Sequence, residues 1–141
     1  LAESCTGGLV SSSITSISGA SNFFESAIIS YSNNAKIKLL GINRNLILKH
    51  GAVSKEVALS MAKNLHRLTR SHICASITGI AGPGGGSKQK PVGTVYFSIY
   101  KKIGNKITIN NYKKIFNSKN RIIIQKKSND FLLRELLAII D

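Results

Sequence analysis

The sequence predicts an α/β fold: a single three-layer αβα domain with a mixed sheet. Three observations lead to this prediction. Segments rich in β-branched residues alternate with segments of helical periodicity, two strand-like segments are joined by a tight turn, and a glycine-rich loop follows another strand. A chain of 141 residues has the length of one ordinary domain, so we expect a single folded unit.

The N-terminal region contains a short predicted helix. Apolar residues at helical spacing begin after Thr6, and Gly19 is the stop signal. Ser4, Cys5 and Thr6 are candidate N-caps, and the chain runs into this helix from Leu1 with no strand before it. The apolar stripe consists of Val10, Ile14 and Ile17.

A strand and the start of a second helix come next. The brief β-branched run at residues 27–31 (AIISY) predicts a strand. Ser32, Asn33 and Asn34 follow it and are typical of a helix N-cap. Lys36 is therefore expected in the first turn of that helix.

Two more helices are predicted before the middle of the chain. Residues 45–49 form one or two helical turns that Gly51 closes. Ser54 caps a longer amphipathic helix that extends to about Arg70. Its buried face is expected to consist of Val57, Met61, Leu65 and Leu68.

The second half of the chain contains three predicted strands and a last helix. Residues 73–78 are apolar enough for a central strand, which leads into a loop over residues 79–91. Residues 92–100 and 106–116 are strands joined by the hairpin turn IGNK. Ser128 is expected to cap the final helix, whose apolar positions are Phe131, Leu132, Leu136 and Ile140.

Composition narrows the class of protein. With 43% hydrophobic and 18% charged residues, the chain is globular rather than disordered. No run approaches the roughly 20 apolar residues of a membrane helix, and the start LAESCTGG lacks the features of a secretory signal. Cys5 and Cys74 are too few for a disulfide framework or a structural zinc site. We expect a cytoplasmic protein with free thiols and no membrane contact.

The net charge of +14 raises the possibility of a nucleic-acid partner. It arises from 20 Lys and Arg residues against 6 Asp and Glu residues. The basic residues are mostly lysines, and they concentrate between Lys101 and Lys127 among many Ile and Asn residues. Solvated charge is the commoner outcome of such a composition, so no specific nucleic-acid binding is expected.

The first candidate site is residues 3–8 (ESCTGG). Hydroxyl or thiol residues just before a helix place backbone N–H groups and the positive end of the helix dipole around an oxyanion or phosphate. Ser4 is a candidate nucleophile and Cys5 a rival one. In the alternative interpretation, Ser4 and Thr6 only cap the helix.

A serine nucleophile needs a base. The three histidines, His50, His66 and His72, have no neighbouring carboxylate that indicates a triad. A lysine is the alternative, because its pKa falls when it is desolvated or lies at a helix N-terminus. Lys36 has such a position.

Other patterns are weaker. Ser60 and Lys63 have the S-x-x-K spacing of acyl-transfer enzymes, but they lie on the polar side of a helix. The loop at residues 78–86 (TGIAGPGGG) allows N–H groups to converge on an anion, although it matches neither a Walker A loop nor a dinucleotide fingerprint. No cluster has metal-ligand spacing, so we expect chemistry that uses no metal or cofactor.

Four motifs occur in one order over about residues 1–100: AESCTGG, GASNFFESAIISYSNNAK, KHGAVSKE and SITGIAGPGGGSKQKPVGTVYF. Together they resemble the C-terminal domain of the CinA family. The members of that family that act alone are nicotinamide-nucleotide amidohydrolases of the PncC type (NMN deamidases). The resemblance implies hydrolysis of the carboxamide of nicotinamide mononucleotide (NMN) to nicotinate mononucleotide and ammonia, a step of pyridine-nucleotide recycling.

The resemblance also implies roles for individual residues. Ser4 matches the nucleophile, Lys36 its general base and Tyr31 a residue that orients the pair, with no metal or cofactor. The positions that match the nucleotide pocket are Ser21, Asn33, Thr78 and Gly79, and those placed to give N–H donors to an oxyanion or phosphate are Thr6, Gly7 and Gly8.

The chain departs from the family pattern in three ways. Relatives carry a helix and a strand before AESCTGG, so a domain over residues 1–141 is expected to lack them, which would expose a sheet edge and unseat Ser4. After Tyr100 the resemblance fades, and Arg121 matches a phosphate-gripping arginine only across an insertion. The nucleotide pyrophosphatase domain of longer members is absent, so no pyrophosphatase activity is expected.

One alternative to the amidohydrolase stays open, and one expectation concerns assembly. The altered region at residues 116–121 and the missing N-terminal elements also fit a catalytically inactive remnant that binds a nucleotide or a partner protein. A homo-oligomer is expected for a small domain of this kind.

Overall fold

The computed structural model describes residues 1–140, and they fold into five strands, five α-helices and one 3-10 turn. The strands are β1 (Ala2–Glu3), β2 (Ile28–Ile29), β3 (Ile73–Gly79), β4 (Thr94–Ile103) and β5 (Lys106–Ile115). The helices are α1 (Leu9–Thr15), η1 (Ala20–Asn22), α2 (Asn33–Leu40), α3 (Arg44–His50), α4 (Lys55–Thr69) and α5 (Arg121–Ile140).

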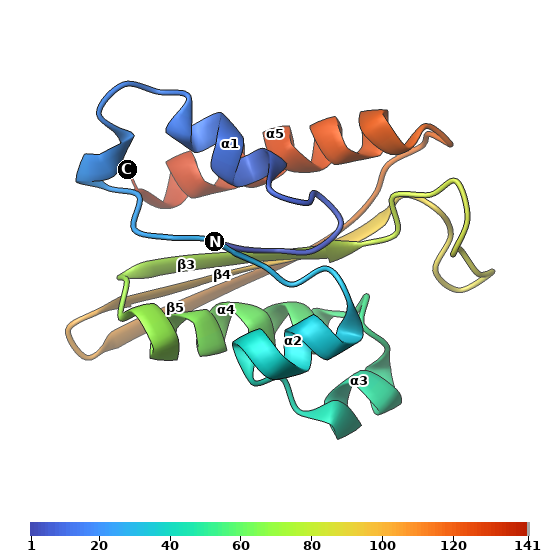
Figure 1. Ribbon diagram of the computed structural model, residues 1–141, viewed down its shortest axis with the longest axis horizontal. Helices are drawn as coiled ribbons and strands as arrows, with labels where there is room; N and C mark the ends of the chain where they lie inside the picture. Colours follow the sequence, from blue (N-terminus) through green and yellow to red (C-terminus); the bar gives the residue numbers. More distant parts are fainter. Residues whose placement is uncertain (141) are drawn as a thin grey trace.

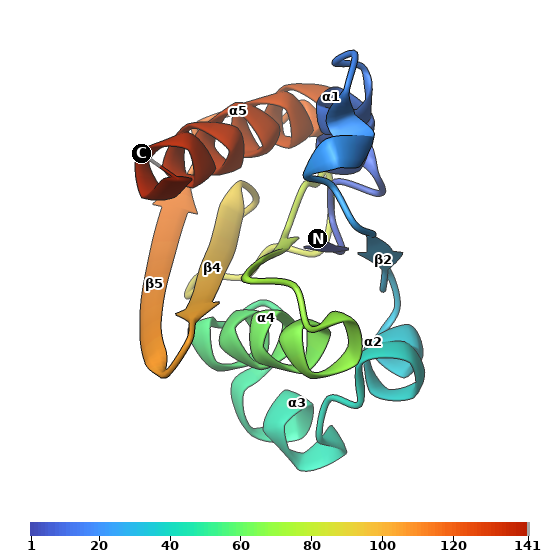
Figure 2. The same cartoon turned by 90° about the vertical axis from the view of Figure 1, so that its left-hand side faces the viewer.

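The strands form one mixed sheet in the order β2-β1-β3-β4-β5. β1 runs parallel to β2 and β3, whereas β3, β4 and β5 are antiparallel neighbours. Helices α1 and α5 cover one face of the sheet, and α2, α3 and α4 cover the other (Figure 1). The view turned by 90° shows the three layers end on (Figure 2). The predicted three-layer α/β domain with a mixed sheet is therefore confirmed.

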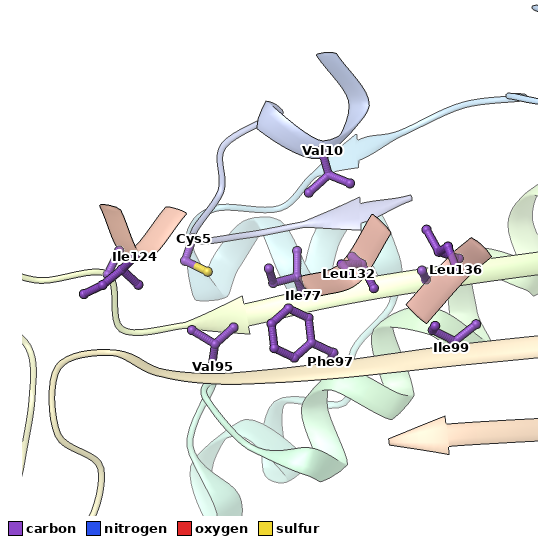
Figure 3. Packing of buried hydrophobic residues seen from close by; sticks show 11 residues of the cluster. Cys5, Val10, Ile77, Val95, Phe97, Ile99, Ile124, Leu132 and Leu136 are labelled. Atoms are coloured by element: carbon purple, nitrogen blue, oxygen red, sulfur yellow. The ribbon is translucent and has the colours of Figure 1, made fainter. Parts of the chain in front are cut away.

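Each face of the sheet has its own hydrophobic core. Alternate residues of β4 point to opposite faces, so Val95, Phe97 and Ile99 join the core beneath α1 and α5 (Figure 3). On the other face, Val57, Met61 and Leu65 of α4 pack with residues of α2 and α3. The site described below lies at one end of the sheet, between these two cores.

A strand precedes the first helix, although the sequence predicts none. Ala2 pairs with Ile28 and Ser76, which places the two-residue β1 between β2 and β3. The N–H of Ser4 continues this pairing by donating to the carbonyl of Ile77 at 3.0 Å. The expectation that Ser4 would be unseated is thus wrong. Two residues before a turn are too few for a period-two pattern to be visible in the sequence.

The last helix begins earlier than predicted. α5 starts at Arg121, where Asn120 Oδ1 accepts hydrogen bonds from the N–H groups of Ile122 and Ile123 at 2.9 and 3.3 Å. Ser128 is buried inside this helix, so its prediction as the cap is wrong. The β-branched and basic residues of the first two turns conceal the helical pattern in the sequence.

Three residues predicted on the apolar faces of helices are exposed. Ile17 lies beyond the end of α1 and is 59% exposed, Leu68 near the end of α4 is 58% exposed, and Ile140 at the end of α5 is 61% exposed. The other predicted elements agree with the structure to within a few residues at their ends. Within residues 1–140, no helix combines the length and the apolar character needed to span a bilayer.

Candidate active site

A small cavity opens at the carboxyl ends of the three parallel strands. Such an edge is where open α/β sheets commonly bind ligands. The cavity follows β1 and β3 directly, and the first turns of α2 and α5 and the approach to α4 complete its wall. Its volume is about 180 Å³, and it is lined by Ser4, Cys5, Tyr31, Asn33, Lys36, Ala52, Val53, Thr78, Gly79, Ala81 and Arg121.

Ser4 and Lys36 meet at the bottom of this cavity. Lys36 Nζ lies 2.8 Å from Ser4 Oγ, 2.8 Å from the carbonyl oxygen of Ser30 and 3.3 Å from that of Tyr31. The side chains are almost completely removed from solvent, with Ser4 7% and Lys36 1% exposed. With three oxygen neighbours, the Lys36 amine finds hydrogen-bond partners in both its charged and its neutral form. The charged form donates three hydrogen bonds, and the neutral form donates two and accepts one from the Ser4 hydroxyl.

Local structure brings the two side chains together across 32 residues. Ser32 caps α2 by accepting a hydrogen bond from the N–H of Ala35 at 3.0 Å, which places Lys36 one turn into the helix. Ser4 directly follows β1, the strand between β2 and β3, and its N–H is bonded to the carbonyl of Ile77 in β3. Because β2 lies next to β1 and leads into α2, the lysine reaches the serine from the neighbouring strand connection.

Burial lowers the pKa of Lys36 from 10.5 to about 8, and the neighbouring Cys5 has a smaller effect in the opposite direction. Within residues 1–140, no carboxylate forms an ion pair with this amine. A large fraction of Lys36 is therefore neutral near pH 8. A neutral amine hydrogen-bonded to a serine hydroxyl can accept its proton, which is the arrangement that activates a serine nucleophile.

Cys5 is not equipped to compete with Ser4 as a nucleophile. Burial raises the pKa of its thiol to about 12, so it stays protonated in neutral solution. Its side chain belongs to the hydrophobic cluster with Val10 and Ile77 (Figure 3). Its backbone is more relevant, because the N–H of Cys5 makes no hydrogen bond to another residue that the structure describes. The carbonyl of Cys5 accepts from Gln125 Nε2 at 2.8 Å.

Tyr31 contacts the pair through its main chain rather than through its ring. Its carbonyl oxygen lies 3.3 Å from Lys36 Nζ and 3.5 Å from Ser4 Oγ. Tyr31 is 56% exposed, and its phenol oxygen accepts a hydrogen bond from Arg121 at the mouth of the cavity. Arg121 also donates to the carbonyl of Gly82 at 2.9 Å. The structure thus brings Arg121 to the site despite the weak match in its sequence region.

The turn between Ser4 and α1 differs from the prediction. Neither Ser4 nor Thr6 caps α1, whose N-cap is Gly8 without a side-chain hydrogen bond. The N–H of Gly7 donates to the carbonyl of Ser4, and the N–H of Gly8 donates to the carboxylate of Glu3, both at 3.0 Å. Partners within the turn therefore already occupy the N–H groups of Gly7 and Gly8, which were expected to serve an oxyanion or phosphate.

The remaining predicted residues divide into two groups. Asn33, Thr78 and Gly79 line the cavity, and Thr78 Oγ1 donates to the carbonyl of Ala52 at 2.9 Å. Gly79 has no room for a side chain, since an added Cβ would lie 2.7 Å from a methyl carbon of Val95. Ser21 and the Thr6–Gly8 turn are absent from the described lining. Ser21 lies in the exposed turn η1.

Sequence reasoning missed part of the wall and two supports of the turn. Ala52 and Val53 form part of the wall; they lie in the KHGAVSKE motif just before the Ser54 cap of α4, but no role is predicted for them. Gln125 and Glu3 hold the turn that follows Ser4. Nothing in the local sequence indicates such a role for Gln125, which is distant in the chain and becomes a neighbour only through α5.

A larger cavity lies elsewhere and does not contain this chemistry. It has a volume of about 670 Å³ and lies between η1, the start of β3 and the end of α5. Its wall is mostly apolar, and neither Ser4 nor Lys36 belongs to it. Reactive groups in contact identify an active site better than size does, so the smaller cavity is the candidate. None of the three histidines lies in its described lining, and no three metal-binding side chains cluster anywhere in residues 1–140.

The fold and the site define a three-layer α/β domain with a buried serine–lysine pair at the carboxyl edge of its sheet. The family model described as the CinA C-terminal domain matches residues 1–140, and the chain belongs to this family. A CinA-like protein of Prochlorococcus marinus subsp. pastoris (strain CCMP1986 / NIES-2087 / MED4) is 54% identical over 99% of the chain. A putative competence-damage inducible protein of Clostridioides difficile (strain 630) is 46% identical over 96% of it.

The chain spans about a third of the length of these relatives, 32% and 31% respectively. Among solved structures, the competence/damage inducible protein CihA from Agrobacterium tumefaciens superposes with a TM-score of 0.93 at 34% identity. That superposition covers 99% of this chain and 83% of the other. The family and the fold named by the sequence motifs are therefore confirmed.

Proposed function

We propose that this domain hydrolyses the carboxamide of NMN to nicotinate mononucleotide and ammonia, with Ser4 as the nucleophile and Lys36 as the general base. The observation that carries the proposal is the 2.8 Å contact between Lys36 Nζ and Ser4 Oγ in a buried cavity. Membership of the CinA family supports the choice of substrate through the motifs that resemble the NMN deamidases.

In the first step, neutral Lys36 accepts the proton of the Ser4 hydroxyl while Oγ attacks the amide carbon. The carbonyl π electrons move to oxygen and form a tetrahedral oxyanion. The N–H of Cys5, the residue after the nucleophile, bonds to no other described residue and is a suitable donor to this oxyanion. A donor of this kind contributes roughly a hundredfold or more to the rate.

In the second step, Lys36 returns the proton to the leaving nitrogen. The C–N bond breaks, ammonia departs and an ester joins Ser4 to the nicotinoyl group. Water then attacks the ester with Lys36 again as the base, and the C–O bond to Ser4 breaks. The products are nicotinate mononucleotide and regenerated Ser4.

The shape and charge of the cavity agree with an anionic nucleotide. A volume of about 180 Å³ is below the roughly 300–1,000 Å³ of typical ligand pockets. A cavity of this size suits the nicotinamide ring and carboxamide of NMN, with the ribose and phosphate placed at its mouth. Arg121 stands there as the proposed phosphate contact, and the described lining contains no acidic residue. Asn33, Thr78 and Gly79 remain proposed contacts to the nucleotide.

The test is to incubate the purified, folded chain with NMN and to measure ammonia and nicotinate mononucleotide. Ser4→Ala should abolish product formation without unfolding the domain, whereas Cys5→Ala, at the adjacent buried position, should retain it. Turnover that survives in Ser4→Ala would remove Ser4 from the mechanism. A folded chain that binds NMN in calorimetry but releases no ammonia would instead support the nucleotide-binding remnant.

A further inference from the structure

Glu3 carries a fully buried carboxylate next to the nucleophile. Its side chain is 0% exposed, and within residues 1–140 no basic group lies close enough to form an ion pair with it. An isolated buried charge is costly unless hydrogen bonds satisfy it. Five donors do so here. Oε2 accepts from Thr6 Oγ1 at 2.7 Å and from the N–H groups of Gly8 at 3.0 Å and Val10 at 3.2 Å. Oε1 accepts from the N–H of Ser11 at 2.7 Å and from its hydroxyl.

These donors come from two different places. Thr6 and Gly8 belong to the turn that follows the nucleophile, whereas Val10 and Ser11 belong to the first turn of α1. The carboxylate of Glu3, the last residue of β1, therefore ties this strand both to the turn after Ser4 and to α1. Like an N-cap side chain, Glu3 accepts hydrogen bonds from N–H groups in the first turn of α1. Unlike an N-cap, it lies before the turn at residues 5–8 and also binds donors of that turn.

We propose that Glu3 is a positioning residue for the Ser4 site. This role rests on the proposed function. The carboxylate holds the turn at residues 5–8 so that Ser4 Oγ stays against Lys36 and the N–H groups of Cys5 and Thr6 are not taken up by other described residues. These two are the N–H groups of the turn that make no hydrogen bond to another described residue. The turn is thereby pre-organised: these N–H groups stay available to an oxyanion instead of forming hydrogen bonds within the turn.

A matched pair of variants distinguishes positioning of the Ser4 site by Glu3 from a contribution of Glu3 to the stability of the fold alone. Thr6→Val and Ser11→Ala each remove one side-chain donor to the same carboxylate, the first on the turn beside Ser4 and the second on the helix. We expect similar losses of thermal stability. We also expect Thr6→Val to lower kcat for NMN about tenfold with little change in KM, and Ser11→Ala to keep kcat within about twofold, because small displacements of a nucleophile are costly in rate.

A second measurement does not depend on NMN being the substrate. Phenylmethanesulfonyl fluoride sulfonylates an activated serine, with a new O–S bond to Ser4 and release of fluoride and a proton. Thr6→Val should slow this labelling about tenfold and Ser11→Ala should not. Glu3→Gln replaces one acceptor oxygen by a donor, and should slow it about a hundredfold. If Glu3→Gln fails to fold, the first two variants still decide.

The outcomes separate the two proposals. Equal effects of Thr6→Val and Ser11→Ala on labelling and kcat, or no effect of either, overturn the positioning role. Labelling of Ser4 without any release of ammonia refutes NMN hydrolysis, and the comparison of the two variants then still tests Glu3. A wild-type chain that is neither labelled at Ser4 nor active refutes both.

Discussion

Arg121, the first residue of α5, donates a hydrogen bond to the hydroxyl of Tyr31, a residue that lies between β2 and α2. The two residues are 90 positions apart in the chain and meet at the mouth of the cavity. One end of the guanidinium is held by the phenol and the other by the carbonyl of Gly82. A phosphate at the mouth would meet a charge whose orientation is already set.

Replacing Arg121 by Ala should raise KM for NMN about 10- to 100-fold while kcat changes little, because the proposed contact of Arg121 is a charge-assisted hydrogen bond to the phosphate. Nicotinamide riboside, which lacks the phosphate, should show no such change. Arg134→Ala is the control, since it removes the same charge from an exposed position on the same helix. Equal effects of Arg121→Ala on both substrates would contradict a phosphate contact.

Tyr31→Phe should leave kcat within about twofold of wild type. The contacts of Tyr31 with Ser4 and Lys36 come from its carbonyl oxygen, which the substitution does not touch. Loss of the hydroxyl frees one arm of Arg121 and is expected to raise KM by only a few-fold. Steady-state kinetics with NMN check both values. A fall of kcat by two orders of magnitude would show that the phenol itself acts on the reacting groups.

The pH dependence of turnover should follow the neutral fraction of Lys36. Its pKa is about 8, and only the neutral amine accepts the Ser4 proton. We expect kcat/KM, which reports the pKa values of the free enzyme, to rise about tenfold per pH unit below this value and to level off above it. Initial rates at NMN concentrations well below KM, over a series of pH values, measure the profile. A profile that is flat, or that falls as pH rises toward 8, would exclude Lys36 as the base.

The same pKa predicts how stability depends on pH. The pKa of Lys36 is about 8 in the folded chain against 10.5 for the free side chain, so between these values the unfolded chain binds more protons. Its contribution to the free energy of unfolding therefore rises with pH across this window, by up to about 3 kcal/mol. Urea titrations of wild type and Lys36→Met at several pH values isolate this contribution. A difference that stays constant with pH would contradict it.

Much of the fold is readable in the sequence because its signals are local. Ser32 and Ser54 cap α2 and α4 as predicted, and the IGNK turn joins β4 to β5. Strand β1 and the start of α5 are not readable in this way. A two-residue strand exists only because two partners flank it, and the cap of α5 follows a region without helical periodicity.

The site residues that belong to sequence motifs could be predicted, whereas the contacts that depend on tertiary structure could not. Ser4, Lys36, Asn33, Thr78 and Gly79 all line the cavity, and each belongs to a motif of the first 100 residues. The bond from Gln125 to the turn depends on how α5 crosses the sheet. The hydrogen bond from the N–H of Gly8 to the Glu3 carboxylate depends on the conformation of the turn. The sequence ESCTGG does not determine this conformation, because the same residues also suit a turn whose N–H groups bind an external anion.

The sheet itself is uneven, since β1 and β2 pair over two residues each whereas β3, β4 and β5 pair over seven and ten. Ser4 directly follows the short strand β1, and Lys36 lies on α2, the helix that follows the short strand β2. Hydrogen-bonded elements of this length open at a lower free energy than the global transition. Mild heating or denaturant should therefore separate the serine from the lysine while the hairpin remains protected from hydrogen exchange, so the proposed activity should be the first property that this domain loses.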